Sequence, residues 1–175
     1  MKIYIILILF FTQIIARNPD AVGRNGIVVS SHELSSQIGI DILRQGGNAI
    51  DAAIATGFAL SVVHPGAGNI GGGGFMVIRL SDGTVTTIDF REVAPSGAYR
   101  DMFLDDSLNV IPNKSWSTSW AAGVPGSVAG FGLAHEKYGS VSWRKLLSPS
   151  INVLLLFSFK ISLIGTILFL FISTS

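Results

Sequence analysis

The sequence predicts an α+β domain in residues 20–150, because patterns typical of helices and of strands both occur there. In residues 34–43, leucine and isoleucine recur at intervals of three and four positions, which is typical of an amphipathic helix. Residues 75–90, FMVIRLSDGTVTTIDF, contain two apolar and β-branched runs on either side of an Asp-Gly pair, which is typical of a β-hairpin. A stretch of this length is long enough to bury a core of its own.

An apolar segment precedes this domain. Residues 1–19 begin MKIYIILILFF, where Lys2 is followed by a run close in length to a signal-peptide hydrophobic region and short for a membrane span. We expect a signal peptide or a signal anchor, and therefore a protein that is secreted, periplasmic or on the extracellular face of the plasma membrane. A cytoplasmic chain is the alternative, because Ile14 stands where a cleavage site needs a small residue.

A second apolar segment, INVLLLFSFKISLIGTILFLFISTS, follows the domain at residues 151–175. As a helix, these 25 residues would extend about 37 Å, which is enough to cross a bilayer. Lys160 lies inside the segment and would cost about 2.5–3.5 kcal/mol at the bilayer centre. Two interpretations stay open: a membrane segment, or a tail foreign to the domain that arises from a truncated or frameshifted gene model.

A strand and two helices are expected at the start of the domain. The run GIVVSS, residues 26–31, is β-branched and is expected to form a buried strand. Gly46 and Gly47 are expected to end the helix that follows. Asn48 is the expected N-cap of the next helix, which is apolar on nearly every side and ends before Pro65. The apolar stripe of the first helix consists of Leu34, Ile38, Ile42 and Leu43.

The glycine-rich stretch HPGAGNIGGGGF, residues 64–75, contains a match to the dinucleotide-binding pattern G-x-G-x-x-G. In a dinucleotide-binding unit that loop follows a strand and opens a helix. Here it follows a predicted helix and precedes a predicted strand, which argues against nucleotide binding. Because glycine permits close approach of the backbone, we expect the chain to pass here against other elements, or close to a substrate, with no room for side chains.

Asp82 and Gly83 predict a type I′ hairpin turn. The second strand of the hairpin is expected over residues 84–90 and brings Arg91 to its end. The elements expected after Arg91 are a long loop with one helical turn at residues 99–103, a helix at residues 127–137 and a short helix from residue 142 onward.

Composition excludes several classes of function. The net charge of +1 is too small to indicate nucleic-acid binding, and the lack of cysteine excludes disulfides, thiolate catalysis and cysteine-based zinc sites. His32, His64 and His135 are widely separated, so we expect no metal and no cofactor, and His64 is expected to cap a helix. Asn113 begins an N-x-S sequon in a predicted loop, and we expect glycosylation there if the source is eukaryotic.

Three blocks in one order, GGNAIDAAIATGFALSVVHPGAGNIGGGGFM, TIDFREVAP with RDMF, and GVPGSVAGF, resemble the start of the large subunit of γ-glutamyltranspeptidase, or glutathione hydrolase. The resemblance covers about residues 26–150. It implies an N-terminal-nucleophile hydrolase fold, a four-layer αββα sandwich of which only the N-terminal part is present. It also implies a self-cleaving proenzyme, whose freed threonine attacks γ-glutamyl amides such as glutathione and passes the acyl group to water, amino acids or peptides.

The resemblance assigns a role to one residue of this chain. Arg91, in DFRE, matches the arginine that binds the α-carboxylate of the γ-glutamyl group. A planar guanidinium holds a carboxylate through two parallel hydrogen bonds, which fits that role. The alternative is a surface ion pair of Arg91 with Asp89 or Glu92, which would contribute little.

The family's nucleophilic threonine and its other glutamate-binding residues belong to the small subunit, several hundred residues further on. We therefore expect no catalytic residue in this chain and no activity without that missing partner subunit. Two other functions stay open: a membrane-associated binding or interaction module derived from such an enzyme, and a glutaryl-type amidase of the same fold.

Overall fold

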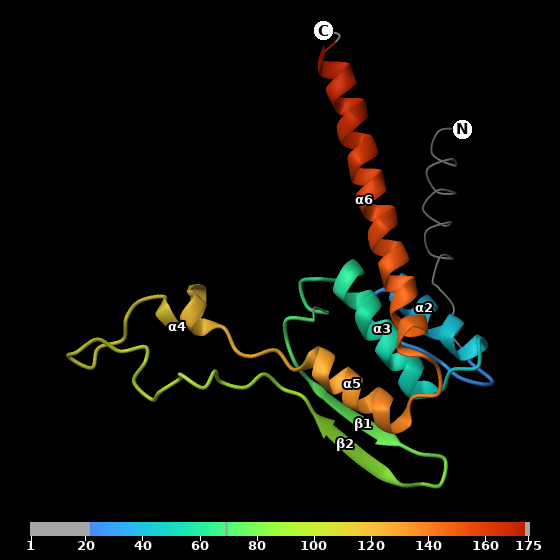
Figure 1. Cartoon of the computed structure of the whole chain (residues 1–175), viewed down its shortest axis with the longest axis horizontal. Coiled ribbons are helices and arrows are strands. Elements are labelled where there is room, and N and C mark those ends of the chain that lie inside the picture. Colours follow the sequence, from blue (N-terminus) through green and yellow to red (C-terminus); the bar gives the residue numbers. More distant parts are fainter. Residues whose placement is uncertain (1–21, 69, 174–175) are drawn as a thin grey trace, which may run out of the picture.

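A computed structural model of the chain describes residues 22–68 and 70–173, with side chains as far as Ser158. The signal segment predicted at residues 1–19 lies outside this range. Figure 1 shows a helical body, a two-stranded hairpin against it, an arm that projects to one side and a long C-terminal helix. In chain order the elements are α2 (Glu33–Arg44), α3 (Ala49–Val63), β1 (Phe75–Arg79), β2 (Val85–Asp89), α4 (Lys114–Ser117), a short 3-10 helix (Ser119–Ala121), α5 (Ser127–Tyr138) and α6 (Trp143–Ser173).

Helix α2 confirms the amphipathic pattern. Its N-cap is His32, whose Nδ1 accepts a hydrogen bond of 3.2 Å from the backbone N–H of Leu34. Ile38 and Ile42 are buried against α3. The helix ends where predicted, because Gly46 adopts a φ of +88°, a left-handed conformation that costs glycine little.

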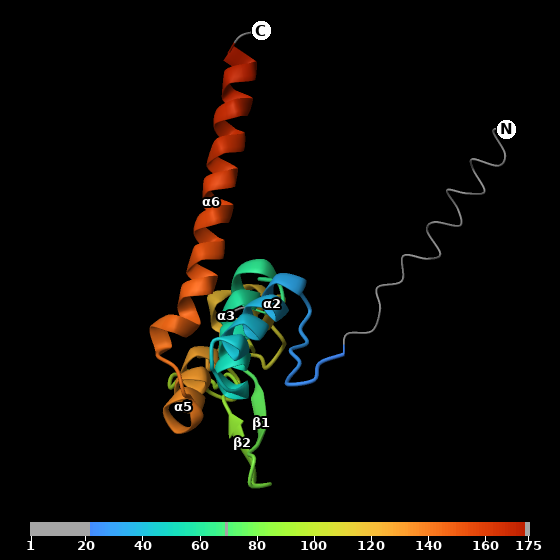
Figure 2. The same cartoon turned by 90° about the vertical axis from the view of Figure 1, so that its right-hand side faces the viewer.

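Helix α3 begins with a capping box. The Asn48 side chain accepts hydrogen bonds from the backbone N–H groups of Ile50 and Asp51, and the Asp51 carboxylate accepts one of 2.9 Å from the N–H of Asn48. The helix is central to the fold and packs against α2, α5 and α6 (Figures 1 and 2). It ends at Val63 with His64 as its C-cap, which confirms the capping position predicted for that histidine. The main buried side chains of the core are Ile38, Ile42, Ile54, Phe58, Ile78, Ile88, Ala134 and Leu146.

The hairpin is present, but its predicted turn type is wrong. Beyond the pair of Arg79 with Val85, the N–H of Leu80 donates to the carbonyl oxygen of Thr84 at 2.8 Å, so three residues, 81–83, form the loop. The N–H of Gly83 donates to the carbonyl oxygen of Leu80 at 3.0 Å. Gly83 has a φ of +89°, whereas Asp82 is not among the positive-φ residues that a type I′ turn requires. A type I turn followed by a left-handed glycine accounts for this geometry.

The strand predicted at residues 26–31 is not formed in the part of the chain that the structure describes. Ile27 and Val29 are exposed while Val28 packs against Gly39 of α2, so burial alternates as it would in a strand. A strand also needs a hydrogen-bonded neighbour, and the sheet of the described residues contains β1 and β2 alone. Periodicity in a sequence does not show whether that neighbour is present.

Residues 93–123 form an arm that leaves the body between β2 and α5 (Figure 1). The two ends of the arm are joined at its base, where Val93 and Val124 exchange backbone hydrogen bonds of 3.3 and 2.9 Å. The helical turn predicted at residues 99–103 is replaced by successive hydrogen-bonded turns, while α4 lies further along the arm.

The last helix, α6, is much longer than the short helix predicted from residue 142. Its first turns belong to the body: Leu146 is fully buried, and the Trp143 ring packs edge-on against Phe58 with ring centroids 5.5 Å apart. Farther on, the helix runs away from the body (Figures 1 and 2), and Leu155 and Leu156 are each 62% exposed. Among residues 22–68 and 70–158, no helix is both long enough and apolar enough to span a membrane.

Candidate functional site

Arg91 lies just beyond the paired part of the hairpin. The ladder continues past β2 to Phe90, whose N–H donates to the Gly74 carbonyl oxygen at 3.0 Å. At the next residue the chain leaves the ladder, and the N–H of Arg91 instead donates to Oδ1 of Asp89 at 3.0 Å. The end of β2 and the glycine-rich stretch before β1 therefore meet at Arg91.

The Arg91 side chain is exposed. Its guanidinium carbon lies 5.9 Å from the centre of the Phe75 ring, a distance at which a cation is attracted to an aromatic face. Neither Asp89 nor Glu92 forms an ion pair with it among the described residues. Within residues 22–68 and 70–158 the positive charge is thus held beside an aromatic ring with no carboxylate in ion-pair contact, and it could bind the carboxylate of a ligand.

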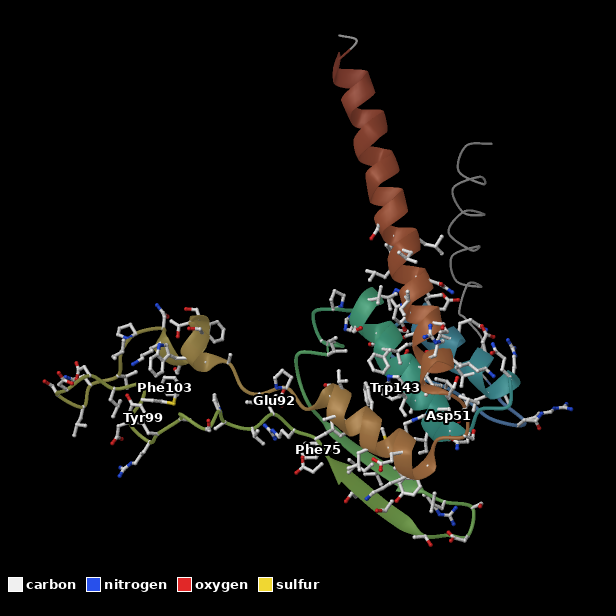
Figure 3. The ribbon with its side chains drawn as sticks, in the orientation of Figure 1. Asp51, Phe75, Glu92, Tyr99, Phe103 and Trp143 are labelled. Carbon is white, nitrogen blue, oxygen red and sulfur yellow. The ribbon has the colours of Figure 1, made fainter. Side chains whose placement is uncertain are left out.

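A cavity of about 490 Å³ opens beside this arginine, between the end of β2 and the base of the arm. Glu92 lines it at the base of the arm and Phe103 lies farther out along the arm (Figure 3). Met102 and Trp120 complete its apolar side. Arg91 and Glu92 are the charged residues of its lining, and the guanidinium of Arg91 is the group there that could bind a ligand's carboxylate.

Two other cavities, of about 630 and 730 Å³, are larger than the one beside Arg91. They lie along residues 25–30, where that segment crosses α2 and α3. The larger one has mostly small apolar walls and no charged side chain. We assign the candidate site to the smaller cavity because Arg91, the residue predicted to bind a carboxylate, lines it.

The glycine-rich stretch has the role of close packing predicted for it. A Cβ atom on Gly73 would lie 2.7 Å from the backbone nitrogen of Glu92 and 2.8 Å from Cα of Arg91. From a different part of the chain, a Cβ on Gly126 would overlap the carbonyl group of Phe90. Strand β1 follows the glycines, as expected, and a nucleotide-binding loop would instead open a helix.

The three histidines have structural positions. His32 and His64 cap the ends of helices, and Nε2 of His135 lies 2.7 Å from the carbonyl oxygen of Val141. Within the described part of the chain, no group of histidine and acidic residues is arranged to hold a metal ion.

Ionisable groups with shifted pKa values lie elsewhere in the fold. Burial acts to raise the pKa of Asp51, but hydrogen bonds from Ser140 and Asn48 outweigh it and lower the pKa. Hydrogen bonds from the backbone and side chain of Thr84 lower the pKa of Asp82 in the hairpin loop. Neither carboxyl lines the cavity beside Arg91, and both hold the backbone in place.

Asn113, the sequon residue, is exposed in the arm and has a φ of 63° immediately before α4. Its glycosylation stays a prediction.

Sequence reasoning missed Gly126, whose packing against Phe90 depends on a contact between distant segments. The GVPG turn was a signal that the chain changes direction there, but it did not show what the turn touches.

Residues 35–155 match the family model described as Gamma-glutamyltranspeptidase. A curated relative, the glutathione hydrolase proenzyme of Escherichia coli (strain K12), is 52% identical over 130 residues, which are 74% of this chain and 22% of the relative. The chain thus spans about a fifth of the length of such relatives.

Solved structures agree with this match. The gamma-glutamyltranspeptidase of Helicobacter pylori superposes with a TM-score of 0.74 at 52% identity, over 77% of this chain and 39% of that one. A cephalosporin acylase from Bacillus halodurans superposes with a TM-score of 0.61 at 28% identity, over 78% of this chain and 26% of that one. The body described above is therefore similar to one part of these larger proteins.

Proposed function

The chain belongs to the gamma-glutamyltranspeptidase family, and from that premise we propose that it supplies part of the donor site for glutathione hydrolysis and γ-glutamyl transfer. The family also confirms the fold prediction: these helices and this hairpin are part of the α+β N-terminal-nucleophile hydrolase fold. The observation that carries the proposal is the exposed guanidinium of Arg91, held at the end of a β-hairpin beside a cavity of about 490 Å³.

In this proposal, Arg91 binds the α-carboxylate of the γ-glutamyl donor. Two parallel N–H groups of the guanidinium would donate to the two carboxylate oxygens, which determines the orientation of the donor as well as its affinity. The ring of Phe75 supports the cation from the strand side. The donor's γ-carbonyl then lies on the far side of the cavity from Arg91, where a nucleophile has to reach it.

We place that nucleophile outside residues 35–155, in the part of the precursor that forms a second subunit. The hydroxyl of a threonine there attacks the γ-carbonyl carbon, the bond to the amide nitrogen breaks, and the departing amine takes up the hydroxyl proton. Water or an amino group then cleaves the resulting ester and regenerates the hydroxyl. This chain binds and orients the donor, and it has no turnover without the second subunit.

The place of action is proposed as well. The apolar start of the chain supports export, so we propose that the protein is secreted, periplasmic or held at the outer face of the plasma membrane. The apolar residues 151–175 support association with a membrane.

The two other functions are less well supported. The match to the Helicobacter pylori gamma-glutamyltranspeptidase structure at 52% identity supports γ-glutamyl donors. Arg91 does not discriminate between γ-glutamyl and glutaryl donors, because a glutaryl group keeps the carboxylate and lacks only the α-amino group of a γ-glutamyl donor. A non-catalytic binding module would need no selectivity for that carboxylate.

The test places residues 35–155 in the Escherichia coli relative, in exchange for the segment that they match. Two donors are compared, γ-glutamyl anilide and γ-aminobutyryl anilide, which differ only in the α-carboxylate. Arg91→Leu should lower kcat/KM for the first donor by about 100-fold, since a charge-assisted pair is lost, and should leave the second donor nearly unchanged.

Arg44→Leu is the matched control, because Arg44 is an exposed arginine on α2 whose ion pair with Asp41 is on the surface. It should leave both donors unchanged. Equal turnover of γ-glutamyl anilide by Arg91→Leu and the parent chimera would sink the proposal. Turnover by the 175-residue chain alone would refute the placement of the nucleophile in a second subunit.

A further inference from the structure

We propose that Gly73 and Gly126 are positioning residues for Arg91, a role that rests on the donor-binding function proposed above. Each glycine lets a separate chain segment approach the backbone at the end of β2 more closely than any side chain would permit. Both pack against the carbonyl group of Phe90, the residue before Arg91, and thereby determine where the guanidinium points.

The contact from Gly73 is with backbone alone. A Cβ there would lie 2.5 Å from the carbonyl oxygen of Phe90, 2.7 Å from the nitrogen of Glu92 and 2.8 Å from Cα of Arg91. Real Cβ atoms do not come so close, and none of the three atoms is the flexible end of a side chain. Any residue larger than glycine at position 73 must therefore move the backbone on both sides of Arg91.

The contact from Gly126 is with the same carbonyl group of Phe90. A Cβ there would overlap the carbonyl oxygen of Phe90 and lie 2.8 Å from its carbonyl carbon. The N–H groups of Gly126 and Ser127 both donate to the carbonyl oxygen of Gly72, at 2.9 and 3.0 Å. The start of α5 is thus hydrogen-bonded to the glycine stretch, and both pack against the end of β2.

Side chains behind this junction fix Phe90 as well. The Phe90 and Phe131 rings are 5.8 Å apart and packed edge to face, and Phe131 in turn packs against Phe58 of α3 at 5.3 Å. A Cβ on Gly130 would overlap the Phe90 ring. Because the ring and the backbone of Phe90 are both held in place, the backbone of Arg91 is held as well, and its guanidinium moves mainly through side-chain torsions.

Other glycines of the chain supply the comparison. Gly66 lies in the same glycine-rich stretch as Gly73, but a Cβ there would meet nothing within 4 Å. No left-handed φ is required at Gly66 or at Gly73, so alanine at either position differs only in the space around it.

The test uses the chimera and the two donors described above. Gly73→Ala should lower kcat/KM for γ-glutamyl anilide by about 100-fold, as expected for a catalytic or binding group displaced by about 1 Å, mainly through a higher KM. The kcat/KM of Gly73→Ala for γ-aminobutyryl anilide should stay near that of the parent chimera, because that donor has no carboxylate for Arg91 to bind. Gly66→Ala should change neither donor.

The two claims fail in different ways. If Arg91→Leu keeps full preference for the carboxylate donor, the proposed function is wrong. If Arg91→Leu loses that preference and Gly73→Ala keeps it, only the positioning role is wrong. If Gly73→Ala lowers kcat/KM equally for both donors, the variant has a general folding defect, and this result would also overturn the positioning role.

A second measurement does not depend on turnover. In the full 175-residue chain, Gly73→Ala should shift the backbone amide resonances of residues 90–92 and the Nε resonance of Arg91, whereas Gly66→Ala should not. Unchanged resonances of residues 90–92 in Gly73→Ala would overturn the inference, whatever kcat/KM the chimera has.

Discussion

The hydroxyl of Ser140 donates a hydrogen bond of 2.5 Å to the carboxylate of Asp51, although the two residues are 89 positions apart in the sequence. The N–H groups of Ser140 and Asn48 donate to the same carboxylate at 3.1 and 2.9 Å, and the Asn48 side chain donates to the carbonyl oxygen of Tyr138 at 2.6 Å. The start of α3 is thereby tied to the connection between α5 and α6.

Asp51→Asn should therefore destabilise the fold. The carboxylate is fully buried and accepts hydrogen bonds from three backbone or side-chain donors, so its loss should cost about 2 kcal/mol or more of the free energy of unfolding. Urea unfolding of the full chain measures this change in the free energy of unfolding. The control is Asp41→Asn on α2, where the ion pair with Arg44 is exposed and the expected change is within about 0.5 kcal/mol. Equal stability of Asp51→Asn and the parent chain would contradict this account.

The same contact predicts a dependence of stability on pH. Hydrogen bonds lower the pKa of Asp51 in the folded state below its ordinary value of 3.8, so the unfolded chain takes up a proton first as the pH falls. The stabilisation is therefore fully present above pH 3.8 and is lost as the pH falls through the folded-state pKa. Unfolding free energies between neutral and acidic pH should show the difference between parent and Asp51→Asn shrinking below that value. A difference in unfolding free energy that stays constant with pH would contradict a lowered pKa of Asp51 in the folded state.

Leu146 joins α6 to the rest of the body. Its side chain is fully buried in the core, so Leu146→Ala should leave a cavity and reduce the free energy of unfolding by about 3 kcal/mol. Leu156→Ala, on the same helix, is the control: Leu156 is 62% exposed, and the expected change is within about 0.5 kcal/mol. Denaturant unfolding of both variants measures the contrast. Similar losses in the two would mean that α6 does not pack on α3 through its first turns.

The hairpin loop depends on Gly83. With a φ of +89° and no atom near its missing side chain, the residue is constrained by conformation and not by space. Gly83→Ala should cost about 1–2 kcal/mol, the usual price of a left-handed conformation for a residue with a Cβ. Gly97→Ala in the arm, which has open space and an ordinary φ, should cost much less. Thermal unfolding distinguishes them, and equal melting temperatures would show that the loop adopts another turn.

Much of the fold was predictable because its signals are local. The apolar spacing of α2, the capping residues of α3, the left-handed glycine after α2 and the two strands around Asp82 all depend on residues within a few positions of one another. Even Arg91 could be placed at the end of a strand from the sequence. Its role came from the resemblance to a family and not from periodicity.

The errors have a common origin in contacts between distant segments. Residues 26–31 have the composition of a strand, yet a strand forms only where another backbone lies beside it to accept and donate hydrogen bonds. The hairpin turn differs from the predicted type because strand register, and not the Asp-Gly pair alone, sets the length of the loop.

The sequence by itself determined α2, α3 and α5, the ends of α2 and α3, and the position of Arg91 along the chain, since short-range spacing and capping decide these. Only the tertiary structure decided what surrounds that arginine: the ring of Phe75, the cavity at the base of the arm, and the two glycines that pack against the end of β2. These neighbours come from segments as far apart as residues 73 and 126. They meet because burial of the core brings the glycine stretch, β2 and α5 together, which no local pattern encodes.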